Sequence, residues 1–140
     1  MEKIEKRVLI NAPVSKVWKA LTDKNELKEW MQAPTTFEPV IGKEFMYKHE
    51  KTENWDGNIY CKVMEVEVNK KLSFTWNSQM IEAETLVTIL ISEVDGKTEL
   101  SLIHTGWEKV PAEIRSQMIA GHNNGWEERI VKKLPEFLSD

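Results

Sequence analysis

The sequence has few of the residues and spacings that support covalent or metal chemistry. Its one cysteine, Cys61, excludes an internal disulfide and cannot by itself build a cysteine-rich metal site. There is no HExxH or CxxC spacing, no GxSxG nucleophile elbow and no glycine-rich loop before a helix. The sequence therefore predicts no metal, no cofactor and no catalytic residue, and we expect Cys61 to be a small buried side chain in a strand.

Features of membrane and nucleic-acid proteins are also missing. No apolar run approaches the ~20 residues of a membrane span. The N-terminus has mixed charge and leads directly into a strand-like segment, unlike a signal peptide. The net charge is -4 and the 19 basic residues do not cluster, which argues against a nucleic-acid partner. We expect a cytoplasmic protein that binds neither membrane nor nucleic acid.

The composition that is present is globular. The chain has 140 residues, of which 41% are hydrophobic and 30% are charged. It shows no internal repeat and no linker, so residues 1–140 are predicted to form a single domain. Six tryptophans are many for this length, and such side chains fill a core or form the wall of a ligand pocket.

The most informative stretch is a long amphipathic helix predicted from about Ala112 to Leu134, roughly 35 Å at 1.5 Å per residue. Pro135 should end or kink it. Six residues fall on one side at helical spacing: Ile114, Met118, Gly121, His122, Gly125 and Trp126. Because each glycine costs about 1 kcal/mol relative to alanine inside a helix, two on this face indicate a close approach. Either packed backbone or an occupied hollow should lie against them.

Ahead of this helix the sequence alternates as strands do. Ile4 to Ile10 reads as a first strand, Pro13 starts a short helix, and Asp23 with Glu26 resembles a capping box that opens a second one, ended by Pro34. Further strands are predicted at Thr35–Pro39, Glu44–Glu50, Asn58–Val68 with a bulge, Leu72–Trp76, Ala83–Val94 and Thr98–Thr105. Short turns between consecutive strands indicate an antiparallel sheet, which a single long helix can cover. The fold class is therefore α+β.

Several local strings, in this order, resemble the START-like superfamily, also called SRPBCC or helix-grip. They are NAPVSKVWKALTD (Asn11–Asp23), LKEW (Leu27–Trp30), VMEV (Val63–Val66), LSFTW (Leu72–Trp76), GKT (Gly96–Thr98), HTGW (His104–Trp107) and GW (Gly125–Trp126). Within it the chain looks like the homologues of the activator of the heat-shock chaperone ATPase. The resemblance implies a Bet v 1-like curved antiparallel sheet of about six to seven strands wrapped around the long C-terminal helix, with two short helices after strand one.

The resemblance implies several functions. Superfamily members bind lipids, hormones or polyketides, and some are cyclases or hydroxylase domains. Founding members of the subgroup stimulate the ninety-kilodalton heat-shock chaperone, which implies a stress-response role. Eukaryotic activators carry a separate N-terminal domain that contacts the chaperone. This chain begins at the first strand, so we expect chaperone stimulation to be the second hypothesis and not the first.

The first hypothesis is non-catalytic binding of a small apolar molecule between the long helix and the sheet. Polar-tipped aromatic residues recur on strand faces that should be buried, and such atoms need partners. The alternative is a solid core, which aromatic residues at this spacing form more often. The predicted lining consists of Tyr47, Tyr60, Phe74, Trp76, His104, Met118, His122, Gly125 and Trp126. Entry is expected past the Trp30–Pro34 and Asn77–Met80 loops.

Other chemistry has weaker support. His49, His104 and His122 could converge, but no metal-ligand spacing accompanies them. A cyclase or hydrolase would need Glu65, Glu84 or one of these histidines on the inner face with a shifted pKa. The sequence leaves open a monomer or a homodimer formed through a free sheet edge.

Overall fold

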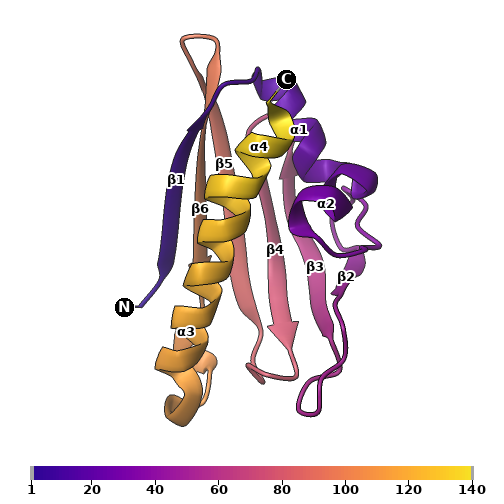
Figure 1. The fold of residues 1–140 in the computed structure, drawn as a ribbon, viewed down its shortest axis with the longest axis vertical. Coiled ribbons are helices and arrows are strands. Elements are labelled where there is room, and N and C mark those ends of the chain that lie inside the picture. Colours follow the sequence, from indigo (N-terminus) through magenta and orange to yellow (C-terminus); the bar gives the residue numbers. More distant parts are fainter. Residues whose placement is uncertain (1, 140) are drawn as a thin grey trace.

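In the computed structural model, which describes residues 2–139, one long helix lies across a six-stranded antiparallel sheet (Figure 1). The elements follow in the order β1 (Ile4–Ile10), α1 (Val14–Thr22), α2 (Lys24–Met31), β2 (Glu44–Lys48), β3 (Asn58–Glu67), β4 (Lys71–Ser78), β5 (Thr85–Val94), β6 (Lys97–Thr105), η1 (Trp107–Lys109), α3 (Ala112–Trp126), η2 (Glu127–Lys133) and α4 (Leu134–Leu138). This arrangement confirms the predicted α+β helix-grip fold.

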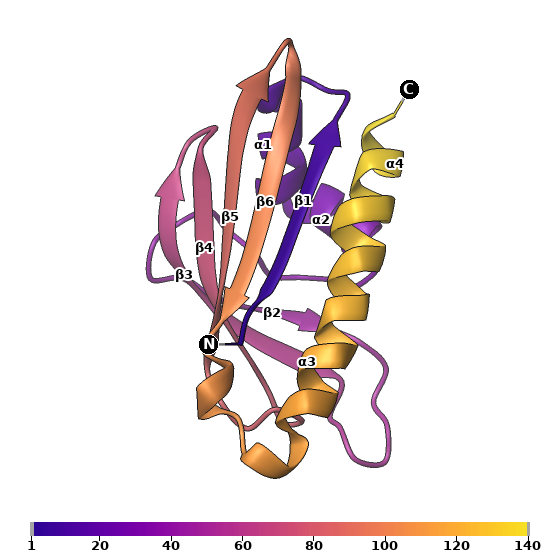
Figure 2. The ribbon, with the colours of Figure 1, turned by 90° about the vertical axis from the view of Figure 1, so that its left-hand side faces the viewer.

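The sheet has the strand order β1-β6-β5-β4-β3-β2, so β1 and β2 are its two edges. Each neighbouring pair is antiparallel, and the register of β3 against β4 shifts between Val63 and Glu65. This shift confirms the bulge predicted in the third strand, and bulges of this kind increase strand bending and twist. Figure 2 shows the resulting curved sheet edge-on, with the long helix along one side.

The two short helices form where the sequence predicts them. In α1, Val17, Ala20 and Leu21 are buried at helical spacing. Asp23 then begins α2 by accepting hydrogen bonds at Oδ1 from the backbone N–H of Asn25 (2.8 Å) and Glu26 (3.2 Å). The reciprocal half of the capping box does not form, because the N–H of Asp23 is already bonded to the Lys19 carbonyl at the end of α1.

The predicted strand Thr35–Pro39 is wrong. Only Thr35 forms an isolated bridge, to Tyr47 on β2. Prolines at both ends remove backbone donors, and Phe37 turns inward to become 2% exposed. The segment therefore lies against β2 without extending the sheet.

Of the two outcomes expected at Pro135, an end of the long helix near Leu134 does not occur. Helical structure continues from α3 through the π-helical segment η2 and into α4, which ends at Leu138. Pro135 lies two residues after Lys133, the last residue of the π-helical segment, and the wider turn changes which carbonyl the proline ring faces. Leu134 and Leu138 are buried, and α4 contacts both α1 and α2.

We predict that Asp23→Ala lowers the free energy of unfolding by about 1 kcal/mol, because two N–H groups at the start of α2 lose their acceptor. Urea unfolding followed by circular dichroism measures the change. Asp23→Ser keeps a capping oxygen and should lose only a small part of this stability. Equal losses in the two variants would show that the cap does not stabilise α2.

Candidate functional site

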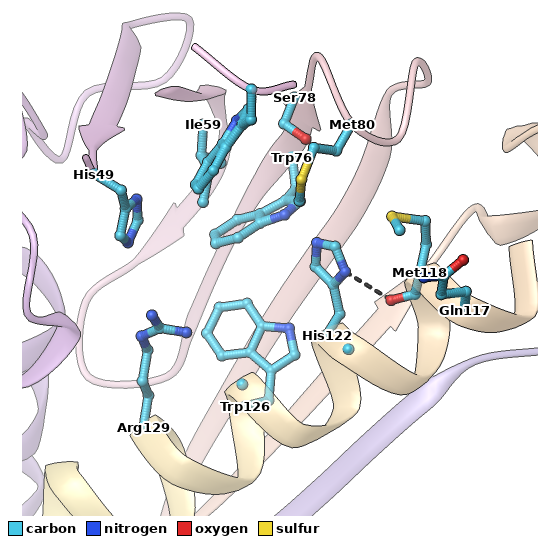
Figure 3. Close-up of a pocket in the computed structure, with 13 residues that line it drawn as sticks. His49, Ile59, Trp76, Ser78, Met80, Gln117, Met118, His122, Trp126 and Arg129 are labelled. Carbon is cyan, nitrogen blue, oxygen red and sulfur yellow. Dashed lines mark hydrogen bonds between the residues drawn. The ribbon is translucent and has the colours of Figure 1, made fainter. Parts of the chain in front are cut away.

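A cavity of about 290 Å³ lies between the long helix and the sheet, at the end where β4 finishes. It is lined by His49, Trp55, Ile59, Trp76, Ser78, Met80, Gln117, Met118, Gly121, His122, Gly125, Trp126 and Arg129. Figure 3 shows these side chains, with those of β4 facing those of the helix. The volume is at the lower end of the range for small-molecule sites.

Two tryptophans form the floor of the cavity. Trp76 on β4 is 4% exposed and Trp126 at the end of α3 is 3% exposed. Their ring centroids are 5.1 Å apart and the rings are tilted by 54°. Met80, Gln117 and Gly121 are exposed and form the rim. The site is thus aromatic at the bottom and open to solvent above.

A buried hydrogen-bond chain fixes the floor. The Thr85 hydroxyl donates to the Trp76 carbonyl (2.7 Å), so it must accept from Nε2–H of His104 (2.7 Å). Nδ1 of His104 is then unprotonated and accepts from Nε1–H of Trp126 (3.1 Å). These hydrogen bonds connect β4 through β5 and β6 to the long helix, and they require His104 to be neutral.

The protonation of the histidines follows from burial. Burial lowers the pKa of His104 well below its usual value, and nearby His122 lowers it further. Burial also lowers the pKa of His122, against the opposing effect of the hydrogen bond from its Nδ1–H to the Met118 carbonyl (2.8 Å). The pKa of His49 is lowered by burial and then by the charge of Arg129. All three side chains are therefore neutral near pH 7.

The two helix glycines border the cavity without touching packed backbone. A Cβ at Gly121 would meet no atom within 4 Å, whereas one at Gly125 would lie 3.1 Å from Nη1 of Arg129. Of the two explanations for these glycines, the structure therefore favours a hollow over close backbone packing. The missing side chain of Gly121 leaves open space beside the cavity, and that of Gly125 leaves room for the Arg129 guanidinium.

The structure brings together five of the nine residues predicted to line a pocket: Trp76, Met118, His122, Gly125 and Trp126. His104 is fully buried beneath the cavity floor, where it accepts a hydrogen bond from Trp126. Tyr47 and Phe74 are core residues further along the sheet, with 2% and 4% exposure. Tyr60 does not line the cavity: it is 45% exposed on the opposite face of β3 and bonds to Asp56 (2.8 Å).

Several lining residues were not predicted, and each has a reason. His49 falls within the strand predicted at Glu44–Glu50 but lies just beyond the end of β2, and Trp55 lies in the loop between β2 and β3 among mostly polar residues. Arg129 extends the helical face by one turn beyond Gly125, a spacing that could have identified it. Of the two loops expected at the entry, Asn77–Met80 contributes Ser78 and Met80 to the lining, whereas Trp30–Pro34 contributes no residue.

Three buried polar atoms of the lining have no hydrogen-bond partner among residues 2–139. They are Nδ1 of His49, Nε1 of Trp76 and Oγ of Ser78. Buried polar groups in folded proteins are almost always paired. Unpartnered atoms that cluster in one hollow indicate a place where solvent or a ligand supplies the missing contacts.

The remaining chemical candidates lie elsewhere. Glu65 binds Lys71 (3.0 Å) and Ser73 (3.2 Å) on the outer face, and Glu84 is exposed. Cys61 is 4% exposed, and burial raises the pKa of its thiol. Within residues 2–139, no group of three or more His, Cys, Asp or Glu side chains could hold a metal ion. No acidic residue lines the cavity in that part of the chain.

A second hollow, of about 940 Å³, lies between the start of α1 and the far ends of β4, β5 and β6. Charged residues, among them Glu67, Lys70 and Glu99, make up much of its lining. Charged side chains of this kind are normally solvated. We therefore regard the smaller aromatic cavity as the candidate site.

The comparisons with known proteins agree with the fold. Residues 11–139 match the family described as Activator of Hsp90 ATPase homolog 1-like protein. Among solved structures, protein MLL2253 from Mesorhizobium loti is 26% identical, with 98% of this chain and 96% of that chain covered and a TM-score of 0.82. Among curated proteins, none matches the sequence.

Two further structures share the fold at lower identity. Protein BH1534 from Bacillus halodurans is 24% identical, covering 99% of this chain and 98% of its own, with a TM-score of 0.77. The Aha1 dimer from Colwellia psychrerythraea is 19% identical, covering 94% and 99%, with a TM-score of 0.68. Within the described residues, no helix is long and apolar enough to cross a membrane.

We predict that His104 makes stability depend on pH. Its folded pKa is lowered, so below the usual value of 6.5 the unfolded chain binds a proton that the folded chain does not. The free energy of unfolding should therefore fall as the pH drops from 6.5, by up to about 1.4 kcal/mol per pH unit for each such histidine. Urea unfolding at a series of pH values measures this slope.

His104→Gln should flatten that slope, although it also lowers stability at neutral pH. Thr85→Val is the matched control, because it removes a hydrogen bond of the same chain without removing a titratable group. It should lower stability and keep the wild-type slope. A wild-type slope in His104→Gln would contradict the assignment.

Proposed function

The chain belongs to the Activator of Hsp90 ATPase homolog 1-like protein family, and on that premise we propose that it is a non-catalytic binding module for a small apolar molecule. The proposed site is the cavity over Trp76 and Trp126. We further propose that residues 1–140 form one domain, since the buried residues of the sheet, of α1, of α2 and of the long C-terminal helix belong to one core cluster.

The observation that carries this proposal is an aromatic hollow bordered by two helix glycines. A solid core would gain from side chains at these positions, yet Gly121 faces open space. An aromatic group that buries roughly 150–250 Å² at about 25 cal/mol per Å² gains about 4–6 kcal/mol before the cost of ordering. This gain alone would correspond to dissociation constants of about 1 mM to 40 μM, and the cost of ordering makes binding weaker than that.

Within this proposal the residues have distinct roles. Trp76, Trp126 and Met118 supply apolar contact, and His122 presents Nε2 as a hydrogen-bond acceptor, since its Nδ1–H bonds to the Met118 carbonyl. His104 positions Trp126. Tyr47 and Phe74 support the floor through the aromatic row that reaches Trp76. Tyr60 is not part of the proposed site.

We predict that Gly121→Leu lowers the affinity for a neutral probe, 2-naphthalenemethanol, by roughly tenfold or more, because the new side chain fills the cavity. The same change should raise the free energy of unfolding by up to about 1 kcal/mol, because glycine is a poor helix residue. Tryptophan fluorescence and isothermal titration calorimetry measure binding. Urea unfolding measures stability.

Ala120→Leu is the matched control, since Ala120 is exposed on the same helix and lies outside the lining. It should bind the probe like the wild type. If Gly121→Leu stays folded and keeps full affinity, the probe does not bind in this cavity. If the wild type binds no apolar probe, the binding proposal itself fails.

A chaperone-linked interaction is the second candidate, and the family assignment favours it. Such an interaction would use the outer surface of the protein. In that case the purified chain should stimulate the ATPase rate of the ninety-kilodalton chaperone of its own host, and Gly121→Leu should stimulate it equally. An unchanged ATPase rate across a concentration series would remove this candidate. The enzyme hypothesis gains no comparable support, because the cavity lining includes no carboxylate within the described residues.

A further inference from the structure

Arg129 places a positive charge in the wall of the cavity. It lies on η2, one turn beyond Gly125, and its guanidinium lies across the space that a side chain at position 125 would take. Nε–H donates to the Met31 carbonyl at the end of α2 (3.2 Å). Figure 3 shows the guanidinium pointing into the hollow toward His49 and the two tryptophans.

This charge has no counterion in the described chain. The two neighbouring carboxylates are held by lysines, Glu127 by Lys6 (2.9 Å) and Glu128 by Lys132 (3.7 Å). Within residues 2–139, Arg129 forms no ion pair, and its Nη1 and Nη2 form no hydrogen bond. Arg115 on the same helix is different, because its guanidinium bonds to the carbonyls of Glu108 and Val110.

A partly buried guanidinium without a counterion is costly, and arginine cannot escape by losing its proton. Burial lowers the pKa of Arg129, and the Tyr47 side chain and the Glu128 carboxylate partly oppose that change. The remaining N–H groups form a planar fork that matches the two oxygens of a carboxylate. An anion in the cavity would supply the missing partner.

The surroundings also fit an anionic group. The charge of Arg129 acts on His49, whose buried Nδ1 has no partner within residues 2–139. Figure 3 places His49 and Arg129 at one end of the hollow, with Met118 and Gln117 at the other. One end is thus cationic and polar, and the tryptophan floor is apolar.

We propose that the ligand is an amphipathic carboxylate whose head binds the Arg129 fork beside His49 and whose apolar body lies on Trp76 and Trp126. The proposal rests on the proposed binding function and specifies its ligand class. One unpaired guanidinium fits a monoanion better than a phosphate dianion. At ~30 Å³ for each water-sized group, a cavity of about 290 Å³ holds a body of roughly ten non-hydrogen atoms.

The test compares two probes with one skeleton, 2-naphthoate and the neutral 2-naphthalenemethanol. Wild-type protein should bind the carboxylate about ten- to a hundredfold more tightly than the alcohol, as charge-assisted hydrogen bonds of this kind allow. Arg129→Met should lose that preference and bind the alcohol within about twofold of the wild type. Calorimetry gives the affinities.

Lys28→Met is the matched control, because it removes one exposed positive charge on α2, outside the cavity lining, and leaves the Glu128–Lys132 pair intact. It should keep the preference for the carboxylate. If Arg129→Met does not fold, NMR of the arginine side chains in wild-type protein replaces it. Naphthoate should then shift the Arg129 signals and raise the pKa of His49.

The outcomes separate the two proposals. Equal binding of the two probes by the wild type, or no effect of Arg129→Met on naphthoate, would overturn the carboxylate assignment and leave apolar binding intact. If neither probe binds to folded wild-type protein, both proposals fail. A preference that Lys28→Met also removes would mean that net charge, and not Arg129, attracts the anion.

Discussion

The hydrogen bond between Trp126 and His104 holds the long helix at its place over the sheet. It ends a chain in which each donor has one acceptor, from Trp126 through His104 and Thr85 to the Trp76 carbonyl. A sliding helix would leave two buried polar groups unpaired, Nε1–H of Trp126 and Nδ1 of His104. The two tryptophans that form the cavity floor are therefore held in a fixed relation.

The long helix is well packed after Trp126 and less buried before it. Beyond Trp126, the residues Ile130, Leu134 and Leu138 are buried against the core and the short helices. Before it, α3 has no other fully buried residue. The cavity lies beside this less buried part of the helix, and Gly121 adds no side chain to it.

Much of the fold could be predicted, because local spacing and turn chemistry determine it. The strand alternation, the Asp23 cap and the bulge near Val63 all depend on neighbouring residues, and all are present. Each wrong prediction has a physical reason. Thr35–Pro39 lacks the donors for a full strand, and Pro135 is tolerated because a π-helical turn precedes it. Tyr60 was placed inside because its aromatic ring suggested burial, although its position on β3 alternates with the buried Ile59 and Cys61.

By itself, the sequence determined the class of the fold, the family resemblance and the helix face that borders the cavity. These follow from periodicity and residue type, which are local properties of a chain. Only the tertiary structure decided which distant residues meet at the site. It brought the loop residue His49 beside Arg129, joined each neighbouring carboxylate to a lysine, and left one guanidinium without a counterion. Charge pairing depends on distances across the folded chain, so no spacing along the sequence could reveal it.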